Sequence, residues 1–129
     1  MNKQFVPYSI ALALKELGFN EECFGWYYLN NPDYIEYERC KLKDCTDIHI
    51  PAPLWQQVLD WLRTEHGINI LIPPCNENHN IVYMYTLYEP DWTNVTDGIF
   101  YPFYEEAREA AMLEAIKIVK GERNESKNN

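Results

Sequence analysis

Glycine is scarce in this sequence, and acidic residues outnumber basic ones. Only 5 of the 129 residues are glycine, and no glycine-rich loop of the kind that cradles phosphate is present. With 11 basic and 20 acidic residues the formal net charge is -9, so the chain lacks the basic surface that nucleic-acid binding requires. We therefore expect no direct binding to DNA or RNA. The negative charge is interpreted first as a source of solubility, and alternatively as a surface for a basic partner.

Long apolar runs are missing as well. No stretch approaches the roughly 20 apolar residues that span a bilayer, and the N-terminal residues lead into an amphipathic segment rather than an apolar signal core. We therefore expect a cytoplasmic protein with no membrane partner. In that reducing compartment the four cysteines should stay unpaired. No cofactor is expected.

The residues that are abundant suffice for one folded domain. Hydrophobic residues make up 47% of the sequence and aromatic residues 15%, and a chain of this length buries roughly two-thirds of its unfolded surface. We predict a single α+β domain over residues 1–121 and a disordered polar tail over 122–129. Each tyrosine and tryptophan also needs a place for its polar group, so many should lie at the edge of the core or on a binding surface.

Three segments have the periodicity of helices: residues 8–18, 53–66 and 102–120. Each begins at or just after a proline and ends at a glycine, which suits the first turn and the C-terminal cap respectively. In the middle helix Trp61 belongs to the apolar stripe, whereas Gln57 falls on the face toward water. We therefore predict that Trp61 is buried in the core.

Strands are predicted in pairs between the helices. Each pair consists of two apolar or aromatic segments joined by a polar turn: 24–29 with 34–39 across 30–33, and 68–72 with 81–89 across 76–80. The element order is then α-ββ-α-ββ-α. A four-stranded, mostly antiparallel sheet made of two hairpins, with three helices on one face, would bury every apolar stripe.

Three blocks resemble small uncharacterised proteins of phages and prophages in Bacteroides-type bacteria. They are Phe5–Tyr8 through Leu14–Glu21 to Cys23–Gly25, then Ala52–Arg63, and then Tyr104–Ala107 into Ala110–Ala115. Those proteins often have Thr or Ser at the place of Pro7 and Ser at the place of Phe103, so this chain lacks both side-chain caps. The resemblance implies a phage accessory protein in the cytoplasm of a bacterial host cell. It implies no catalytic or binding residue.

Cysteine and histidine are spaced in a way that calls for a test of metal binding. Cys40 and Cys45 form a Cys-x4-Cys pair, and Cys75 and His79 form a Cys-x3-His pair, both beside predicted loops. Zinc takes four such ligands in a tetrahedron. The spacings are loose, however, and free cysteines are commonly buried as small apolar residues. We therefore expect no metal, and we place Cys23 in the core.

The same cysteines and histidines are also candidates for a nucleophile and its base. Cys45 could pair with His49, and Cys75 with His79, but neither pair lies in a strand–turn–helix elbow. A non-enzymatic protein is therefore the favoured interpretation. The alternative is a small-molecule-binding or hydrolytic protein with a pocket beside the loop at residues 90–101.

Aromatic residues of that loop are the strongest candidates for a binding surface. Trp92, Phe100 and Tyr101, with Trp26 and Tyr28 on the first hairpin, would form an exposed apolar patch or the wall of a pocket. The alternative is that these rings only cap the open face of the sheet. We expect Trp92 to be at least partly exposed and to contact a protein partner, and Phe100 and Tyr101 to anchor the loop.

Overall fold

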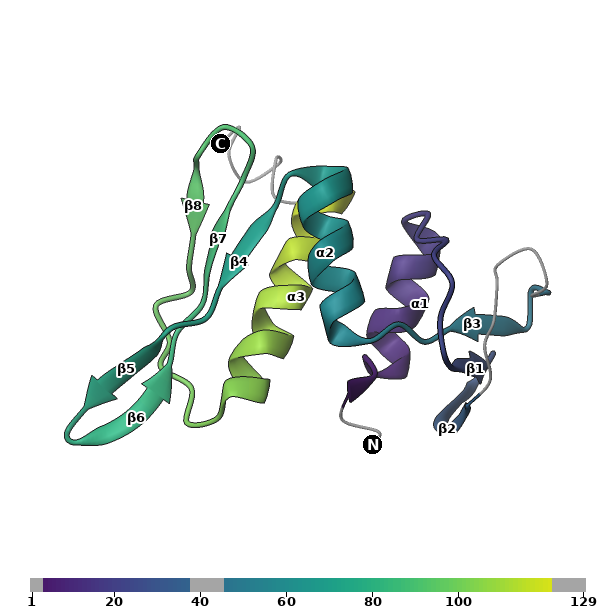
Figure 1. Ribbon diagram of the computed structural model, residues 1–129, viewed down its shortest axis with the longest axis horizontal. Helices are drawn as coiled ribbons and strands as arrows, with labels where there is room; N and C mark the ends of the chain where they lie inside the picture. The colour runs from purple at the N-terminus through teal and green to yellow at the C-terminus, as the bar shows by residue number, and fades with distance from the viewer. Residues whose placement is uncertain (1–3, 38–45, 122–129) are drawn as a thin grey trace. The chain divides into compact units, whose positions relative to one another are not determined.

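A computed structural model describes residues 4–37 and 46–121 of the chain (Figure 1). Within these ranges the chain has three helices and eight strands, which confirms a mixed α+β fold. The contacts divide the chain into two compact units, residues 1–58 and 59–129. Helix α2, Trp55–His66, runs through the boundary between them.

The strands form three small antiparallel sheets, and the prediction of one four-stranded sheet is therefore wrong. The first unit holds β1 (Trp26–Tyr28), β2 (Asn31–Glu36) and β3 (His49–Pro51), and the second holds β4 (Asn69–Leu71), β5 (Pro74–Glu77), β6 (Asn80–Tyr83), β7 (Thr86–Tyr88) and β8 (Asn94–Val95). Their orders are β2-β1-β3, β4-β7-β8 and β5-β6. The element order also differs from the prediction. β3 and β8 lie in segments predicted as loops, β5 overlaps the turn predicted at 76–80, and the single strand predicted at 81–89 is divided into β6 and β7. β3 and β8 are too short to show an alternating pattern.

Helix α1, Tyr8–Glu16, ends as the sequence predicts. Gly18 has a φ of 93°, and the N–H of Phe19 donates to the carbonyl of Leu14 at 3.0 Å, which closes the last turn. The helix buries Ile10 and Leu14 and packs against β3. Its Lys15 ammonium adds a hydrogen bond of 2.9 Å to the His49 carbonyl on that strand.

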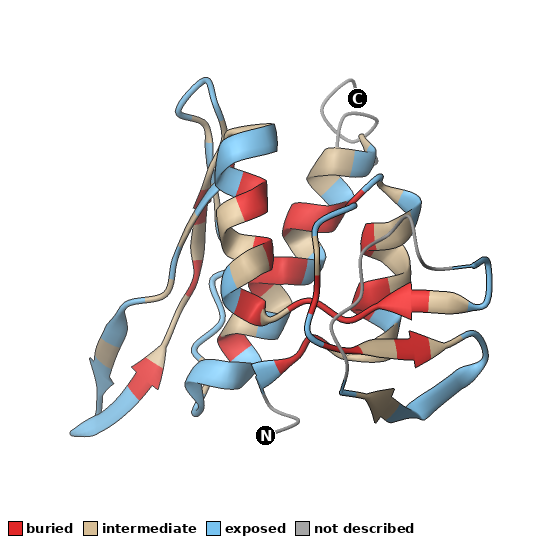
Figure 2. Cartoon of the chain, turned by 45° about the vertical axis from the view of Figure 1, so that its right-hand side comes forward, coloured by how far each residue is buried: buried red, intermediate tan, exposed pale blue. Residues whose placement is uncertain are grey.

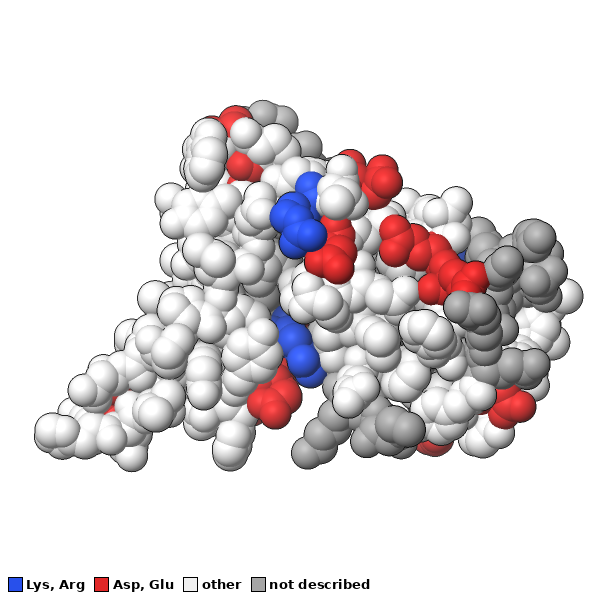
Figure 3. Space-filling model, in the orientation of Figure 1, with Lys and Arg blue, Asp and Glu red and all other residues white. Residues whose placement is uncertain are grey.

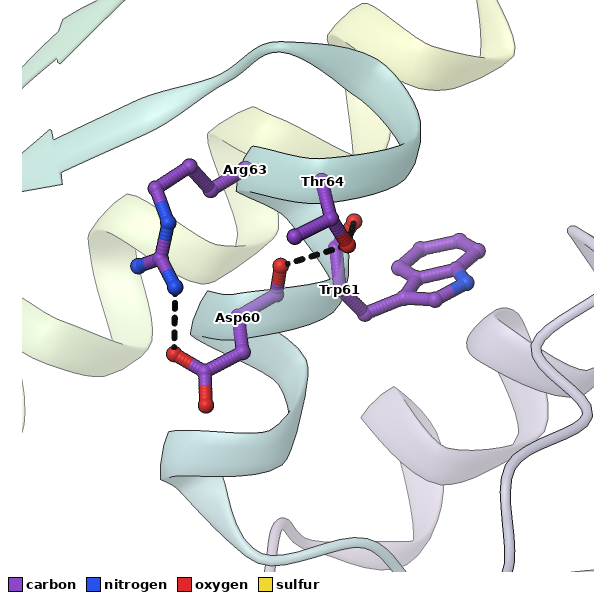
Figure 4. A network of polar contacts seen from close by, with 4 residues as sticks. All are labelled: Asp60, Trp61, Arg63 and Thr64. Atoms are coloured by element: carbon purple, nitrogen blue, oxygen red, sulfur yellow. Dashed lines mark hydrogen bonds and ion pairs between the residues drawn. The ribbon is translucent and has the colours of Figure 1, made fainter.

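Helix α2 presents Trp61 and the pair Asp60–Arg63 to different sides (Figure 4). Trp61 is buried at 5% exposure, as predicted, while Arg63 donates to the Asp60 carboxylate at 3.1 Å. Gln57, predicted to face water, is half-buried instead. Its amide oxygen accepts from the Leu54 N–H at 2.9 Å, and its amide nitrogen donates to the Glu22 carbonyl at 2.8 Å. Gln57 therefore caps the helix, a role that apolar periodicity does not reveal.

The second predicted hairpin exists, but it is interrupted. β4 pairs with β7 and β5 pairs with β6, and both ladders keep one register, with Leu71 opposite Thr86 and Pro74 opposite Tyr83. Two residues on each strand separate the ladders. On the first strand these two residues are Ile72 and Pro73, and β5 begins at Pro74. Neither proline has an N–H to donate, which accounts for the interruption.

Helix α3, Tyr104–Lys120, packs against β6 and β7. Small side chains dominate its buried face, which consists of Ala107, Ala111, Met112, Ala115 and Ile116. Figure 2 shows the burial as bands along the helices, while the tips of the hairpins are exposed. Neither Pro7 nor Phe103 makes a side-chain cap at the start of its helix.

Candidate functional site: the turn between β7 and β8

Residues 89–93 connect β7 (Thr86–Tyr88) to β8 (Asn94–Val95), and the hydrogen-bonded pair Glu89 and Thr93 encloses a loop of three residues. The Glu89 N–H donates to the Thr93 carbonyl at 2.8 Å, and the Trp92 N–H donates to the Glu89 carbonyl at 2.9 Å. Proline suits the first position of such a turn, where Pro90 stands. The pattern matches a three-residue hairpin loop whose last residue is left-handed. That last residue is Trp92.

Trp92 has a φ of 68°, a conformation that this loop usually assigns to glycine. In the left-handed region the Cβ atom crowds a carbonyl oxygen, at a cost of roughly 1–2 kcal/mol. In the described part of the chain the other non-glycine residues with positive φ are Asn30, Asn78 and His79. Asparagine and histidine are among the residue types that adopt this conformation most often, whereas a bulky aromatic residue rarely does. Trp92 therefore carries backbone strain.

The side chain of Trp92 gains little burial in return. It is 80% exposed, the largest exposed fraction among the large apolar residues described. Its ring meets that of Tyr88 edge to face, with centroids 6.2 Å apart. A fully buried tryptophan removes on the order of 150–250 Å² from water. The chain forgoes most of that gain at this position.

The turn beneath Trp92 is firmly supported. Gly67, which ends α2 with a φ of 67°, lies so close to Pro90 that an added Cβ would be 2.7 Å from the proline Cγ. The Asp91 carboxylate accepts from the Thr93 N–H at 3.0 Å. β8 then continues the ladder, with Asn94 opposite Tyr88. Trp92 thus projects from a fixed backbone.

The remainder of the predicted loop is anchored through Tyr101, as expected. Tyr101 and Tyr83 exchange backbone hydrogen bonds of 2.7 and 2.8 Å, and the Tyr101 hydroxyl donates to Asp97 at 2.5 Å. This hydrogen bond, together with some burial, raises the pKa of the Tyr101 phenol to about 12. Phe100, expected to help anchor the segment, is 46% exposed instead.

A second group of exposed apolar residues lies close in sequence to the two residues of this Tyr83–Tyr101 bridge. It consists of Ile81, Phe100, Phe103 and Tyr104. The Tyr104 ring meets Tyr83 edge to face at 5.8 Å and has the Arg108 guanidinium 5.7 Å from its centroid. Burial lowers the pKa of Arg108 from its ordinary value. In Figure 1 this group, near the start of α3, and the β7–β8 turn lie at different ends of the second unit.

Trp26 and Tyr28, the other predicted contact residues, belong to the first unit. Their rings lie 4.9 Å apart, and the His49 ring lies 4.1 Å from Trp26. The His49 Nδ1 atom accepts from the Thr46 N–H at 2.9 Å. Both aromatic rings are half-buried. They therefore pack with a histidine of β3 that the sequence placed in a loop.

The candidate metal and nucleophilic residues do not form a described cluster. Cys40 and Cys45 lie outside the described residues. Cys75 is half-buried in β5, and His79 is exposed in the β5–β6 turn. In the described ranges no group of three or more His, Cys, Asp or Glu residues is placed to hold a metal ion. Cys23 is buried as predicted. Its burial, and to a smaller extent the nearby charges of Glu21 and Glu22, raise the pKa of the thiol to about 12.

Comparisons with known proteins found no match to a family model, to a curated protein or to a solved structure. None of the helices in the described residues is long and apolar enough to cross a membrane. The predicted tail at residues 122–129 lies outside the described residues.

Proposed function

We propose that this chain is a non-enzymatic protein-binding module whose principal contact residue is Trp92. The observation that supports the proposal is a strained, 80% exposed tryptophan at a position that glycine normally occupies. Strain that the fold maintains without a gain in packing is a reason to suspect function. Tryptophan is also enriched among the residues that contribute most to protein interfaces. Contact with a partner would recover the apolar burial that the isolated chain forgoes.

The biological setting of the proposal comes from the sequence resemblance. Similarity to phage and prophage proteins suggests a phage accessory protein that acts in the cytoplasm of a bacterial host. Its partner would then be a host protein or another phage protein.

The proposal can be tested with two matched variants. Trp92→Gly removes the indole and relieves the strained φ, while His79→Gly makes the same backbone change at the exposed β5–β6 turn, where φ is 69°. Tagged wild-type and variant proteins are expressed in the host, and co-purifying proteins are quantified by mass spectrometry. We expect a protein that is retained by wild type and His79→Gly and is lost from Trp92→Gly.

For that protein, the affinity of Trp92→Gly should fall at least about 30-fold, the scale of an interface residue worth 2 kcal/mol. Identical sets of co-purifying proteins for all three forms would contradict the proposal.

A further inference from the structure

The charge of the chain is distributed unevenly around the β7–β8 turn. From Thr64 to Ala107 the sequence contains no lysine or arginine, but it contains seven acidic residues: Glu65, Glu77, Glu89, Asp91, Asp97, Glu105 and Glu106. This stretch includes β4 to β8 and the start of α3. On the face drawn in Figure 3, the basic side chains lie over the helices and none lies over the hairpins. Strands β4 to β8 and the turns between them, including the turn that carries Trp92, therefore contain no lysine or arginine.

The two arginines that flank this stretch already have contacts on their own helices. Arg63 pairs with Asp60 at 3.1 Å on α2, and Arg108 lies 5.7 Å from the Tyr104 ring on α3. Tyr104 thus already has a cation above its ring. In the β7–β8 turn the Trp92 ring contacts Tyr88, the exposed Asp91 directly precedes Trp92 in the chain, and Glu89 is half-buried.

An exposed indole in a stretch whose charged residues are all acidic has a defined chemical preference. The face of a tryptophan ring attracts a lysine or arginine cation, and tryptophan is the strongest of the aromatic residues in this respect. Carboxylates nearby add a field that attracts cations and accelerates their encounter. The same field repels nucleic-acid phosphates, anionic lipid and a second copy of a chain whose net charge is -9. The surface therefore favours one kind of occupant.

We propose, as an extension that rests on the function proposed above, that the partner presents a lysine- and arginine-rich segment. One of its cationic side chains stacks on the Trp92 indole, and the exposed Asp91 of the turn adds negative charge to the same surface. The pairing of an aromatic face with negative charge distinguishes this from general attraction to an acidic protein. Affinity should consequently depend on Trp92 even though its removal leaves the net charge unchanged.

The test uses three synthetic 12-residue peptides of one length with alternating glycine. The first carries lysine and arginine, the second glutamine, and the third glutamate and aspartate. Binding to the full chain is measured by fluorescence anisotropy of the labelled peptide at low and high salt. We expect binding of the basic peptide alone, with an affinity that falls as salt increases.

Two substitutions in the β7–β8 turn and one control test which side chains contribute to peptide binding. Trp92→Gly should lower the affinity for the basic peptide about tenfold, within the range of a cation–π contact. His79→Gly should leave this affinity unchanged. Asp91→Asn removes one charge but keeps the oxygen that accepts from Thr93, and should weaken binding severalfold at low salt and less at high salt.

Equal binding of the basic peptide to wild type and Trp92→Gly would overturn the inference, as would preferential binding of the glutamine peptide or no binding of any peptide. In each of these cases the proposed function stands or falls separately, on whether Trp92→Gly loses a co-purifying protein that His79→Gly retains.

Discussion

Two turns of the second unit differ in how they treat the left-handed backbone. The β5–β6 turn consists of Asn78 and His79, with φ values of 52° and 69°, and Asn76 accepts from the His79 N–H at 3.0 Å. The β7–β8 turn places Trp92 at a φ of 68°. The first turn uses residue types that tolerate this conformation, and its side chains are exposed polar groups. The second uses a large apolar residue that is 80% exposed.

The difference indicates which of the two turns has a sequence that folding alone does not explain. Local preference and backbone geometry agree in the β5–β6 turn, so its sequence is explained by the turn itself. In the β7–β8 turn they disagree, and packing does not resolve the disagreement. Natural sequences break local rules mainly at functional or strained sites. The contrast therefore points to Trp92.

The largest loss of folding stability is expected for a substitution of Trp61, a tryptophan that is buried in the core. Trp61→Ala should lower the free energy of unfolding by roughly 3–5 kcal/mol, because it removes a ring that is 5% exposed. Trp92→Ala should change it by no more than about 0.5 kcal/mol. Urea unfolding of both variants makes the comparison. Equal losses would mean that Trp92 supports the fold and that the contrast between the turns is misread.

The next effect concerns the support beneath the β7–β8 turn. Gly67→Ala should cost about 2–4 kcal/mol, because a left-handed φ of 67° is combined with a Cβ that would approach Pro90 at 2.7 Å. Gly18→Ala is the control, with a φ of 93° and no atom within 4 Å of the added Cβ. It should cost only about 1–2 kcal/mol. If urea unfolding gives the same loss for both, contact with Pro90 does not brace the turn.

Relief of strain gives a smaller effect of opposite sign. Trp92→Gly should leave the free energy of unfolding unchanged or raise it by up to about 1 kcal/mol, because the released strain exceeds the added chain entropy. His79→Gly should change it by less than about 0.5 kcal/mol in either direction. Thermal and urea unfolding measure both variants. A loss above about 1 kcal/mol for Trp92→Gly would show that the indole stabilises the turn.

The smallest effect tests the anchor between the two hairpins. The Tyr101 phenol has its pKa raised from 10.0 to about 12 by its hydrogen bond to Asp97 and by burial. A raised phenol pKa contributes stability below pH 10 that is lost as the pH rises from 10 to about 12. Tyr101→Phe should therefore lose less stability than wild type across this window. Parallel stability profiles would show that the Asp97 contact does not contribute in solution.

The sequence predicted the helices well because their signals are local. Apolar periodicity placed all three, and the glycines at 18, 67 and 121 end them with positive φ. The expected exposure of Trp92 is confirmed. Of the two residues expected to anchor the loop, Tyr101 is held by hydrogen bonds to Tyr83 and Asp97, whereas Phe100 is exposed. Apolar periodicity missed the cap formed by Gln57, since a polar residue outside the apolar stripe gives no sign of the carbonyl that it will meet.

The sheets were predicted less well because strand pairing depends on residues far apart in the chain. β3 and β8 have three and two residues, and no pattern that short predicts a strand. The long strand expected at residues 81–89 is divided into β6 and β7, which pair with β5 and β4 in one common register. The Trp26–His49 contact was missed for the same reason, since β1 had to be paired with β3 first.

The sequence by itself determined three helices, their capping glycines, the acidic character and the stretch from Thr64 to Ala107 without a basic residue. These features follow from composition and from spacing along the chain. The tertiary structure alone decided the division into three sheets and the left-handed backbone of Trp92. That backbone is imposed by the pairing of β7 with β8, because the three-residue loop that joins them requires a left-handed residue at its end.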